Sequence, residues 1–221
     1  MSLKRIFPFS EDDVKSRACL DSTETFVLGD DQSILDSLAL QLAVTSAGAS
    51  EYVAIVGCNA IETAFHVHDM PLFSQDMVDF IRPRFMADLK SLFSYLTKFQ
   101  QLPVYPNVII LHGIETYIQQ ASEDENGDQT IAVLFALVRD ATSFATSKNH
   151  QTCRLLVTCC DAASEGHVCP SYVSLPFFPL PWRCSKLENG GFTLRLGGRL
   201  PTTVRFSLSK RELCLQRVDY F

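Results

Sequence analysis

Short apolar runs alternate with segments of helical periodicity along most of the chain, an order that few folds accommodate. The apolar runs have the length of strands, and they are Phe26–Gly29, Tyr52–Cys58, Val108–Leu111 and Leu155–Cys160. The segments with helical spacing cover about residues 34–43, 85–99 and 130–147. Continuous apolar strands are typical of parallel sheets that are buried on both faces. The sequence therefore predicts an α/β fold with a mostly parallel sheet flanked by helices.

The pattern changes after Pro170, where turn signals follow one another closely. Asn189-Gly190-Gly191 and Gly197-Gly198 are turn sequences that lie between short runs of strand character. These runs are Arg183–Leu187, Phe192–Leu196, Val204–Leu208 and Leu213–Val218. We therefore predict an antiparallel C-terminal strand extension at about residues 182–221.

The chain has 221 residues, of which 47% are apolar and 20% charged, enough for one globular core. We expect an N-terminal tether over residues 1–22 and a single domain over residues 23–221, with an irregular stretch at 59–83. No apolar run reaches the ~18 residues of a membrane span. The eight cysteines lie mostly in strand-like runs, which indicates reduced thiols in the cytoplasm or nucleus.

The charge of the chain is unevenly distributed. Residues 1–181 hold 11 Lys and Arg against 22 Asp and Glu, whereas residues 182–221 hold 8 against 3, for a net charge of -6. This balance excludes a protein that coats nucleic acid generally, but it leaves one basic region for DNA or an acidic partner. The residues predicted to bind DNA weakly, in a salt-dependent and sequence-independent way, are Arg195, Arg199, Arg205, Lys210 and Arg211. The alternative is that they only keep an exposed hairpin soluble.

The run Phe26–Gly29 followed by a helix has the frame of a phosphate-binding P-loop, GxxxxGK[ST]. Only Gly29 of the motif is kept. Ile34 stands at the second glycine, Leu35 at the lysine, and Asp36 at the hydroxyl position. Carboxylates and aliphatic groups therefore occupy the place of the donors that a triphosphate needs. We therefore interpret this segment as the degenerate P-loop of a pseudo-ATPase. We expect the chain to bind no nucleotide or other cofactor and to have no catalytic residue.

The run Val108–Leu111 corresponds to the strand that carries the magnesium-binding aspartate in such enzymes, but it ends in His112. Glu115 stands where an activating glutamate could lie, although a carboxylate at a helix start is the favoured explanation. The alternative to a non-catalytic protein is a divergent NTPase, in which Glu115 and lysines of a neighbouring subunit form a composite site. A third possibility is a general α/β scaffold.

Four stretches in this order resemble a known family: Ile81-Arg82-Pro83, the 85–99 helix, Asn107–Ile118 and Thr203–Leu208. The chain is similar to divergent RecA-type recombinase paralogues. It resembles the ATPase-like Shu-complex subunit that pairs with a SWIM zinc-finger protein, or the small nematode partners of recombinase paralogues. The resemblance implies a RecA-like core and an obligate hetero-oligomer in the nucleus. There it would bind a recombinase paralogue and the recombinase filament, and would support filaments on single-stranded DNA in homologous recombination repair.

The resemblance also points to residues that would bind partners. Recombinases of this type link neighbouring subunits through an aromatic peptide, and Phe7, Phe9 and Ser10 have that form. The segments 29–36 and 112–118, including His112, Glu115 and Tyr117, are predicted to form one face of a heteromeric interface. The alternatives are that the two phenylalanines fold onto the chain's own core and that the segments are ordinary loops.

Two sets of residues contain possible metal ligands, but neither is predicted to bind a metal. One set contains cysteines and a histidine without any CxxC pair, namely Cys153, Cys159, Cys160, His167 and Cys169. The other is the segment with His66, His68 and Asp69, for which no convincing further ligand is found elsewhere in the sequence. A cysteine hydrolase using Cys160 and His167 is also not favoured, because nothing indicates an oxyanion hole.

Overall fold

The computed structural model describes residues 3–9, 22–161, 171–198 and 202–220. Within these residues, ten strands form one mixed sheet in the order β3-β10-β9-β8-β7-β1-β6-β5-β2-β4. The strands are β1 (Glu24–Gly29), β2 (Val53–Gly57), β3 (His66–Val67), β4 (Ile81–Phe85), β5 (Val108–Leu111), β6 (Arg154–Cys160), β7 (Trp182–Lys186), β8 (Gly191–Leu196), β9 (Thr202–Ser209) and β10 (Glu212–Tyr220). The prediction of an α/β fold with a mostly parallel sheet and an antiparallel C-terminal part is confirmed.

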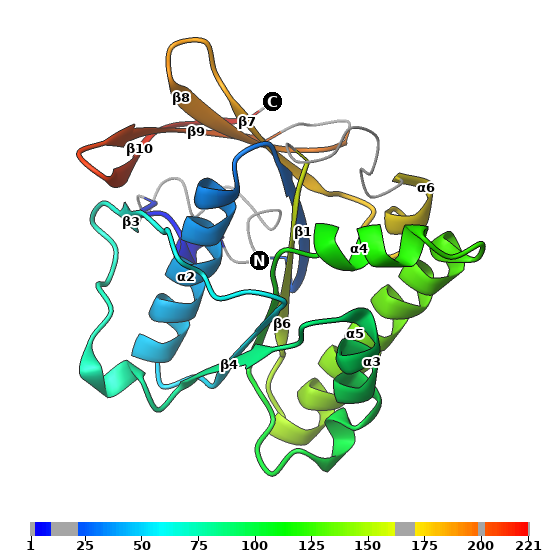
Figure 1. Ribbon diagram of the computed structural model, residues 1–221. Coiled ribbons are helices and arrows are strands. Elements are labelled where there is room, and N and C mark those ends of the chain that lie inside the picture. Colours follow the sequence, from blue (N-terminus) through cyan, green and yellow to red (C-terminus); the bar gives the residue numbers. More distant parts are fainter. Residues whose placement is uncertain (1–2, 10–21, 162–170, 199–201, 221) are drawn as a thin grey trace.

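The helices cover the two faces of the parallel half of this sheet (Figure 1). α2 lies on one face, and α3, α4 and α5 lie on the other. The α-helices are α2 (Gln32–Gly48), α3 (Leu89–Thr97), α4 (Glu115–Ser122), α5 (Gly127–Asn149) and α6 (Ser171–Ser174), and the short 3-10 helices are η1 (Leu3–Arg5), η3 (Gln75–Met77) and η4 (Phe99–Gln101). Asp31 and Asp88 cap the first turns of α2 and α3 through their carboxylates.

Alternation along the buried strands divides the core into two layers. In β5, Val108 and Ile110 pack on the side of α2, while Ile109 and Leu111 pack on the side of α3, α4 and α5. All four residues are buried, which explains the continuous apolar run. β5 pairs in parallel with β2 and β6, and β6 in turn pairs in parallel with β1.

Helix α5 is the only described helix long and apolar enough to cross a membrane. One of its faces, however, is packed in the core, where Leu134, Phe135 and Val138 are almost fully buried against the sheet. A core helix of a globular domain meets the same criteria of length and composition, and α5 is such a helix here.

Several elements differ from the sequence prediction. Residues 59–83 are not wholly irregular, because they contain β3, η3 and the start of β4. β4 pairs in parallel with β2 at the edge of the sheet. Pro83 lies in this edge strand, where a residue without an N–H is tolerated. Glu115–Ser122 forms α4, which the sequence did not separate from its surroundings.

The C-terminal extension continues the same sheet. β7 pairs in parallel with β1, and the pairs β7–β8, β8–β9 and β9–β10 are antiparallel. The inner face of the extension, including Phe192 and Phe206, joins the core layer on the side of α2. The four predicted strands are therefore confirmed.

The prediction of an N-terminal tether is wrong for the described residues 3–9, since this segment packs on the domain. Ile6 and Phe7 are fully buried, and the ring of Phe7 lies 5.3 Å from that of Phe206 in β9. Arg5 donates hydrogen bonds to the Glu51 carboxylate and to Ser46 Oγ. Apolar burial and this ion pair hold the segment against α2, while residues 10–21 lie outside the described part.

Candidate functional site

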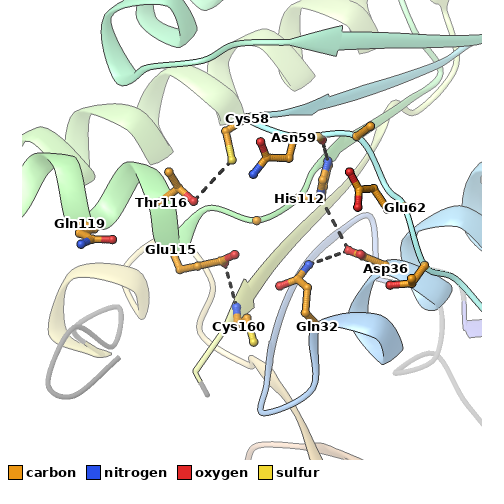
Figure 2. Close-up of a pocket in the computed structure, with 13 residues that line it drawn as sticks. Gln32, Asp36, Cys58, Asn59, Glu62, His112, Glu115, Thr116, Gln119 and Cys160 are labelled. Atoms are coloured by element: carbon orange, nitrogen blue, oxygen red, sulfur yellow. Dashed lines mark hydrogen bonds and ion pairs between the residues drawn. The ribbon is translucent and has the colours of Figure 1, made fainter. Parts of the chain in front are cut away.

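A cleft of about 1110 Å³ opens at the carboxyl ends of the parallel strands, the edge at which ligands bind in open α/β sheets (Figure 2). It lies between the start of α2, the segment after β2, the connection from β5 to α4, and the end of β6. Its lining residues are Gln32, Asp36, Cys58, Asn59, Ala60, Glu62, Thr63, His112, Gly113, Glu115, Thr116, Gln119 and Cys160.

Backbone geometry brings the end of β5 into the cleft. A Cβ atom at Gly57 would lie 2.3 Å from His112 Nε2, so only glycine in β2 allows the imidazole to lie there. Gly113 has a φ of 67°, a left-handed conformation that turns the chain from β5 toward α4. Gly113 N and Ile114 N donate to Thr158 Oγ1 and O of β6, which fixes this turn against the neighbouring strand.

His112 and Asp36 form a buried polar pair. His112 Nε2 donates to the backbone oxygen of Asn59 at 3.0 Å, and its Nδ1 lies 3.9 Å from Asp36 Oδ1 with no hydrogen-bond partner among the described residues. Gln32 Nε2 donates to the same Asp36 oxygen at 2.6 Å. Burial raises the pKa of Asp36 and lowers the pKa of His112, although their mutual attraction opposes both shifts. Burial thus favours the uncharged form of each group.

Glu115 is the first residue of α4, which confirms that it is a carboxylate at a helix start. Its Oε2 accepts a hydrogen bond of 2.9 Å from the backbone N–H of Cys160, at the end of β6. Burial raises the pKa of Glu115, and the nearby Asp36 carboxylate adds to the shift, while the Cys160 hydrogen bond opposes it. The side chain therefore ties α4 to β6, and its charge is disfavoured in this position.

The cleft is acidic. Asp36, Glu62 and Glu115 line it, and none of the lining residues in the described part of the chain is Lys or Arg. Two like charges about 4 Å apart repel by roughly 4 kcal/mol at an effective dielectric constant near 20. To the extent that these acids are charged, a nucleoside triphosphate would be repelled, and no described lining residue offers a compensating cation.

The connection from β1 to α2, which was compared with a P-loop in the sequence, is short and acidic. Gly29 ends β1 as predicted, but only Asp30 and Asp31 connect it to α2. The carboxylate of Asp31 already accepts the N–H of Ile34 at the start of the helix, at 3.2 Å. Leu35 is fully buried, and its Cδ2 would lie 2.9 Å from a Cβ at Gly29. The lysine position is thus part of the core beneath the strand end.

Among the predicted partner-binding residues, Tyr117 and Phe7 lie inside the chain's own core. Tyr117 is fully buried, and its hydroxyl donates to the backbone oxygen of Met86 at 2.6 Å, so it supports the attachment of α4. Phe7 is buried in the chain's own core. Phe9 is partly buried beside Phe7, and Ser10 lies outside the described residues. His112 and Glu115 line the cleft.

The extension presents a second charged surface, the arginine face, formed by Arg183, Arg195, Arg205 and Arg217. Arg183 pairs across strands with Arg195, and Arg205 pairs with Arg217, so each pair shares one face. Thr193, on the same side of β8 as Arg195, pairs with Arg205 and joins the two pairs. All four arginines are exposed.

Two carboxylates partly neutralise the arginine face. The buried Asp219 accepts from Arg205 Nε at 3.1 Å and also contacts Arg217, while Asp161 lies 3.6 Å from Arg183. Arg195 has no acidic partner among the described residues. Of the other predicted DNA-binding residues, Lys210 and Arg211 lie in the turn between β9 and β10, and Arg199 lies outside the described residues.

The cysteines considered for a metal site do not converge in the described structure. Cys159 and Cys160 point into opposite core layers, as expected for adjacent strand residues. Cys153 is buried, and this burial raises its pKa to about 12. His167 and Cys169 lie outside the described residues, so the structure does not test the pairing of Cys160 with His167.

Sequence reasoning missed the polar residues that complete the cleft. Gln32 orients Asp36, Asn59 holds His112 through its carbonyl, and Thr116 accepts a hydrogen bond from the Cys58 thiol. The four-residue spacing of Gln32 and Asp36 in a helix was the available signal for the first of these contacts. Neither a known protein-family model nor any curated protein matches this chain.

Proposed function

We propose that this chain is a non-catalytic, RecA-like recombinase-paralogue subunit of a heteromeric nuclear complex. In this role it promotes or stabilises recombinase filaments on single-stranded DNA during homologous recombination repair. The observation that carries the non-catalytic part is the acidic cleft at the carboxyl edge of the sheet. There Leu35 lies in the core and the described lining residues offer no Lys or Arg for a phosphate.

The RecA-like part of the proposal is supported by the order of elements. A strand ending in Gly29 leads directly into α2, β5 ends in the cleft beside it, and an antiparallel extension follows β6. This is the arrangement that the resemblance to recombinase paralogues implies. It joins a retained architecture to a site whose nucleotide-binding groups are replaced.

The cleft is suited to a cationic group from a partner. Its floor contains the carboxylates of Asp36 and Glu115, and the exposed Glu62 lies at its rim. Burial disfavours the charges of Asp36 and Glu115 in the isolated chain, and an inserted lysine or arginine would relieve that penalty. The same acids that repel a triphosphate therefore make a receptor for a basic side chain.

Exposed apolar side chains support an obligate partner as well. Leu72, Phe73, Val78 and Phe85, with exposed fractions between 40% and 67%, all belong to the segment between β3 and α3. Part of this segment is β4, whose outer edge is the end of the sheet. Apolar side chains along an open strand edge are typical of surfaces that become covered in a complex.

The test is co-expression of the full chain with candidate recombinase paralogues, followed by affinity measurement on the complex that forms. Glu62→Lys should weaken this complex at least about tenfold, or about 1.4 kcal/mol, because it adds a cation at the rim of the receptor. Glu188→Lys is the matched control, since Glu188 is also exposed but lies in the turn between β7 and β8. Equal affinities of the two variants would contradict a partner cation in the cleft.

The arginine face supports the proposed weak contact with single-stranded DNA. Binding of a fluorescent oligothymidylate should weaken with salt, and Arg183→Gln with Arg195→Gln should reduce the salt slope by about 1.4, or about 0.7 for each lost phosphate contact. The control is Lys90→Gln with Lys98→Gln, two exposed cations of the α3 region. A slope that falls equally in both double variants would refute a specific role of the arginine face.

The size of the cleft and the position of Glu115 favour one second candidate, an NTPase with a composite site. In that case a partner's lysines would neutralise the acids and admit the nucleotide. ATP hydrolysis by the purified complex that is abolished by Glu115→Gln would favour this candidate. Hydrolysis that is unaffected by Glu115→Gln would place the activity in the partner and retain the non-catalytic role.

A further inference from the structure

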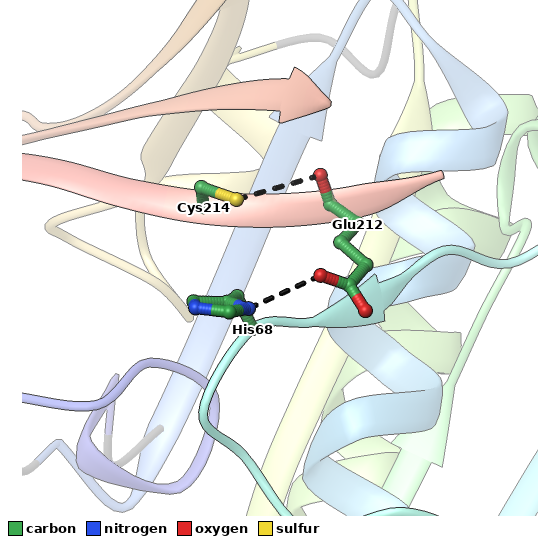
Figure 3. Close-up of side chains that lie close together, drawn as sticks. All are labelled: His68, Glu212 and Cys214. Atoms are coloured by element: carbon green, nitrogen blue, oxygen red, sulfur yellow. Dashed lines mark hydrogen bonds and ion pairs between the residues drawn. The ribbon is translucent and has the colours of Figure 1, made fainter. Parts of the chain in front are cut away.

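A cluster of three different metal-ligand types lies at one edge of the sheet, where β3 pairs with β10. His68 follows β3, and Glu212 and Cys214 belong to β10 (Figure 3). Their imidazole nitrogen, carboxylate oxygen and thiol sulfur all lie within 4.8 Å of one another. His68 Nδ1 is 3.1 Å from Glu212 Oε2.

Sheet register explains why residues so distant in the chain meet. β3 pairs in parallel with β10, with His66 opposite Glu212 and Val67 opposite Leu213. The backbone N–H of His68 donates to Leu213 O at 2.9 Å, which places His68 beside Cys214. Glu212 and Cys214 are two residues apart in a strand, so they share a face. The third partner that the sequence around His66 and His68 lacked is supplied by the C-terminal strand.

We propose that His68, Glu212 and Cys214 bind one Zn²⁺ ion, with an open fourth position. Imidazole, carboxylate and thiolate are the three zinc ligands of proteins, and three protein ligands with a water complete a tetrahedron. A thiolate in the set favours zinc over the hard cations Mg²⁺ and Ca²⁺. The exposed fractions of the His68 and Glu212 side chains, 54% and 42%, leave the ion a direct path from solvent.

Asp69 gives the site an orienting group. Its Oδ1 lies 3.5 Å from His68 Nε2, the ring nitrogen that faces away from Glu212. Histidines that bind a metal usually donate their other N–H to a carboxylate, which fixes the ring and increases the basicity of the ligating nitrogen. The φ of Asp69 is 60°, so the backbone turns here in a left-handed conformation that places this carboxylate beside the ring.

The competing explanation is an exposed His68–Glu212 ion pair that binds no metal. Such a pair requires neither Cys214 nor Asp69. Among the described residues, the Cys214 thiol makes one weak contact, with the backbone oxygen of Glu212 at 4.0 Å. Zinc binding would exchange the thiol proton to buffer for a bond from the sulfur to the ion, so participation of Cys214 separates the two explanations.

The experiment is titration of the reduced, full-length chain with Co²⁺, which replaces Zn²⁺ and reports thiolate ligation through a charge-transfer absorption band. One equivalent of Co²⁺ should produce this band, and one equivalent of Zn²⁺ should remove it. Cys214→Ser should abolish the band, and Asp69→Asn should weaken binding by about 10- to 100-fold. His150→Asn, which replaces an exposed histidine outside the cluster, should leave the titration unchanged.

Absence of a thiolate band, or a band that survives Cys214→Ser with unchanged affinity, would overturn the proposal. Binding that is lost in Cys214→Ser but unchanged in Glu212→Gln and His68→Gln would also overturn it, because the set of three ligands would be wrong. Circular dichroism of each variant without metal identifies a misfolded variant. If Cys214→Ser misfolds, Glu212→Gln and His68→Gln decide, since these side chains are largely exposed.

Discussion

The two ends of the parallel half of the sheet differ in the partners that surround their buried and half-buried acids. At the amino end, the Glu51 carboxylate lies between Arg5 and Arg154, which contact it at 2.5 and 2.9 Å. At the carboxyl end, Asp36 and Glu115 lie in a cleft whose described lining includes no Lys or Arg. Burial raises the pKa of Glu51, but the hydrogen bonds and charges of the two arginines outweigh it, so the pKa of Glu51 is lowered. The pKa values of Asp36 and Glu115 are raised.

This difference indicates that the acid at the amino end stabilises the fold, whereas the acids at the carboxyl end do not. The amino end joins the N-terminal segment, β2 and β6 through one carboxylate with two partners. The carboxyl end keeps acids whose charges are unfavourable in the isolated chain, and such arrangements concentrate at sites that bind something.

The largest expected effect on stability is that of adding a methyl group to Gly57, in the wall of the cleft. Gly57→Ala would place Cβ 2.3 Å from His112 Nε2, so the buried imidazole must move and lose its bond to Asn59. We expect a loss of about 3 kcal/mol in the free energy of unfolding, measured by urea denaturation. Gly48→Ala, near the amino end, is the control, because its Cβ would meet only the flexible end of Met77, at 3.1 Å. A change below about 1 kcal/mol is expected there.

Removal of the charge at the amino end should cost about 2 kcal/mol at neutral pH, because Glu51→Gln leaves two partly buried arginines without their carboxylate. The folded-state pKa of Glu51 is below its ordinary value of 4.5, so its stabilisation is present above that value and is lost as pH falls through the folded-state pKa. Urea denaturation across pH should show the variant and the parent converging in acid. A pH-independent difference would mean that the ion pair does not contribute.

The same substitution at the carboxyl end should have the opposite sign. The folded-state pKa of Glu115 is above its ordinary value of 4.5, so stability is lost as pH rises from that value through the folded-state pKa. Glu115→Gln keeps an oxygen that can accept the Cys160 N–H, and it should stabilise the chain by up to about 1 kcal/mol at pH 7. The gain should vanish near pH 4. If Glu115→Gln instead destabilised the chain at neutral pH, a cation near Glu115 would already be stabilising its charge, and the prediction would be wrong.

Much of the fold follows from local pattern, and the exceptions have physical causes. The bounds of β5 agree with the predicted run, because a strand buried on both faces is apolar throughout. β4 has no such signal, since Ile81–Phe85 is largely exposed and is held by backbone pairing with β2. α4 is too short for helical periodicity to separate it from its neighbours, although Tyr117 and Ile118 anchor it in the core.

The sites divide in the same way. Comparison with the P-loop and with the magnesium-binding strand points to Asp36, His112 and Glu115 in the sequence. The structure brings all three into one cleft. The sequence leaves two possibilities for Phe7, because an aromatic near a proline has the same local pattern whether it is free or buried. The structure shows the second, with Phe7 packed against the inner face of the extension. The meeting of His68 with Cys214 depends on the β3–β10 register, a tertiary contact that no local pattern reports.

Nucleotide affinity tests the central claim most directly. The isolated full-length chain should be titrated with a fluorescent ATP analogue in the presence of Mg²⁺, with an active recombinase as positive control in the same buffer. The acidic cleft predicts no saturable binding up to about 1 mM, which corresponds to less than about 4.1 kcal/mol of binding free energy. Magnesium-dependent binding in the micromolar range that Glu115→Gln changes would contradict the claim.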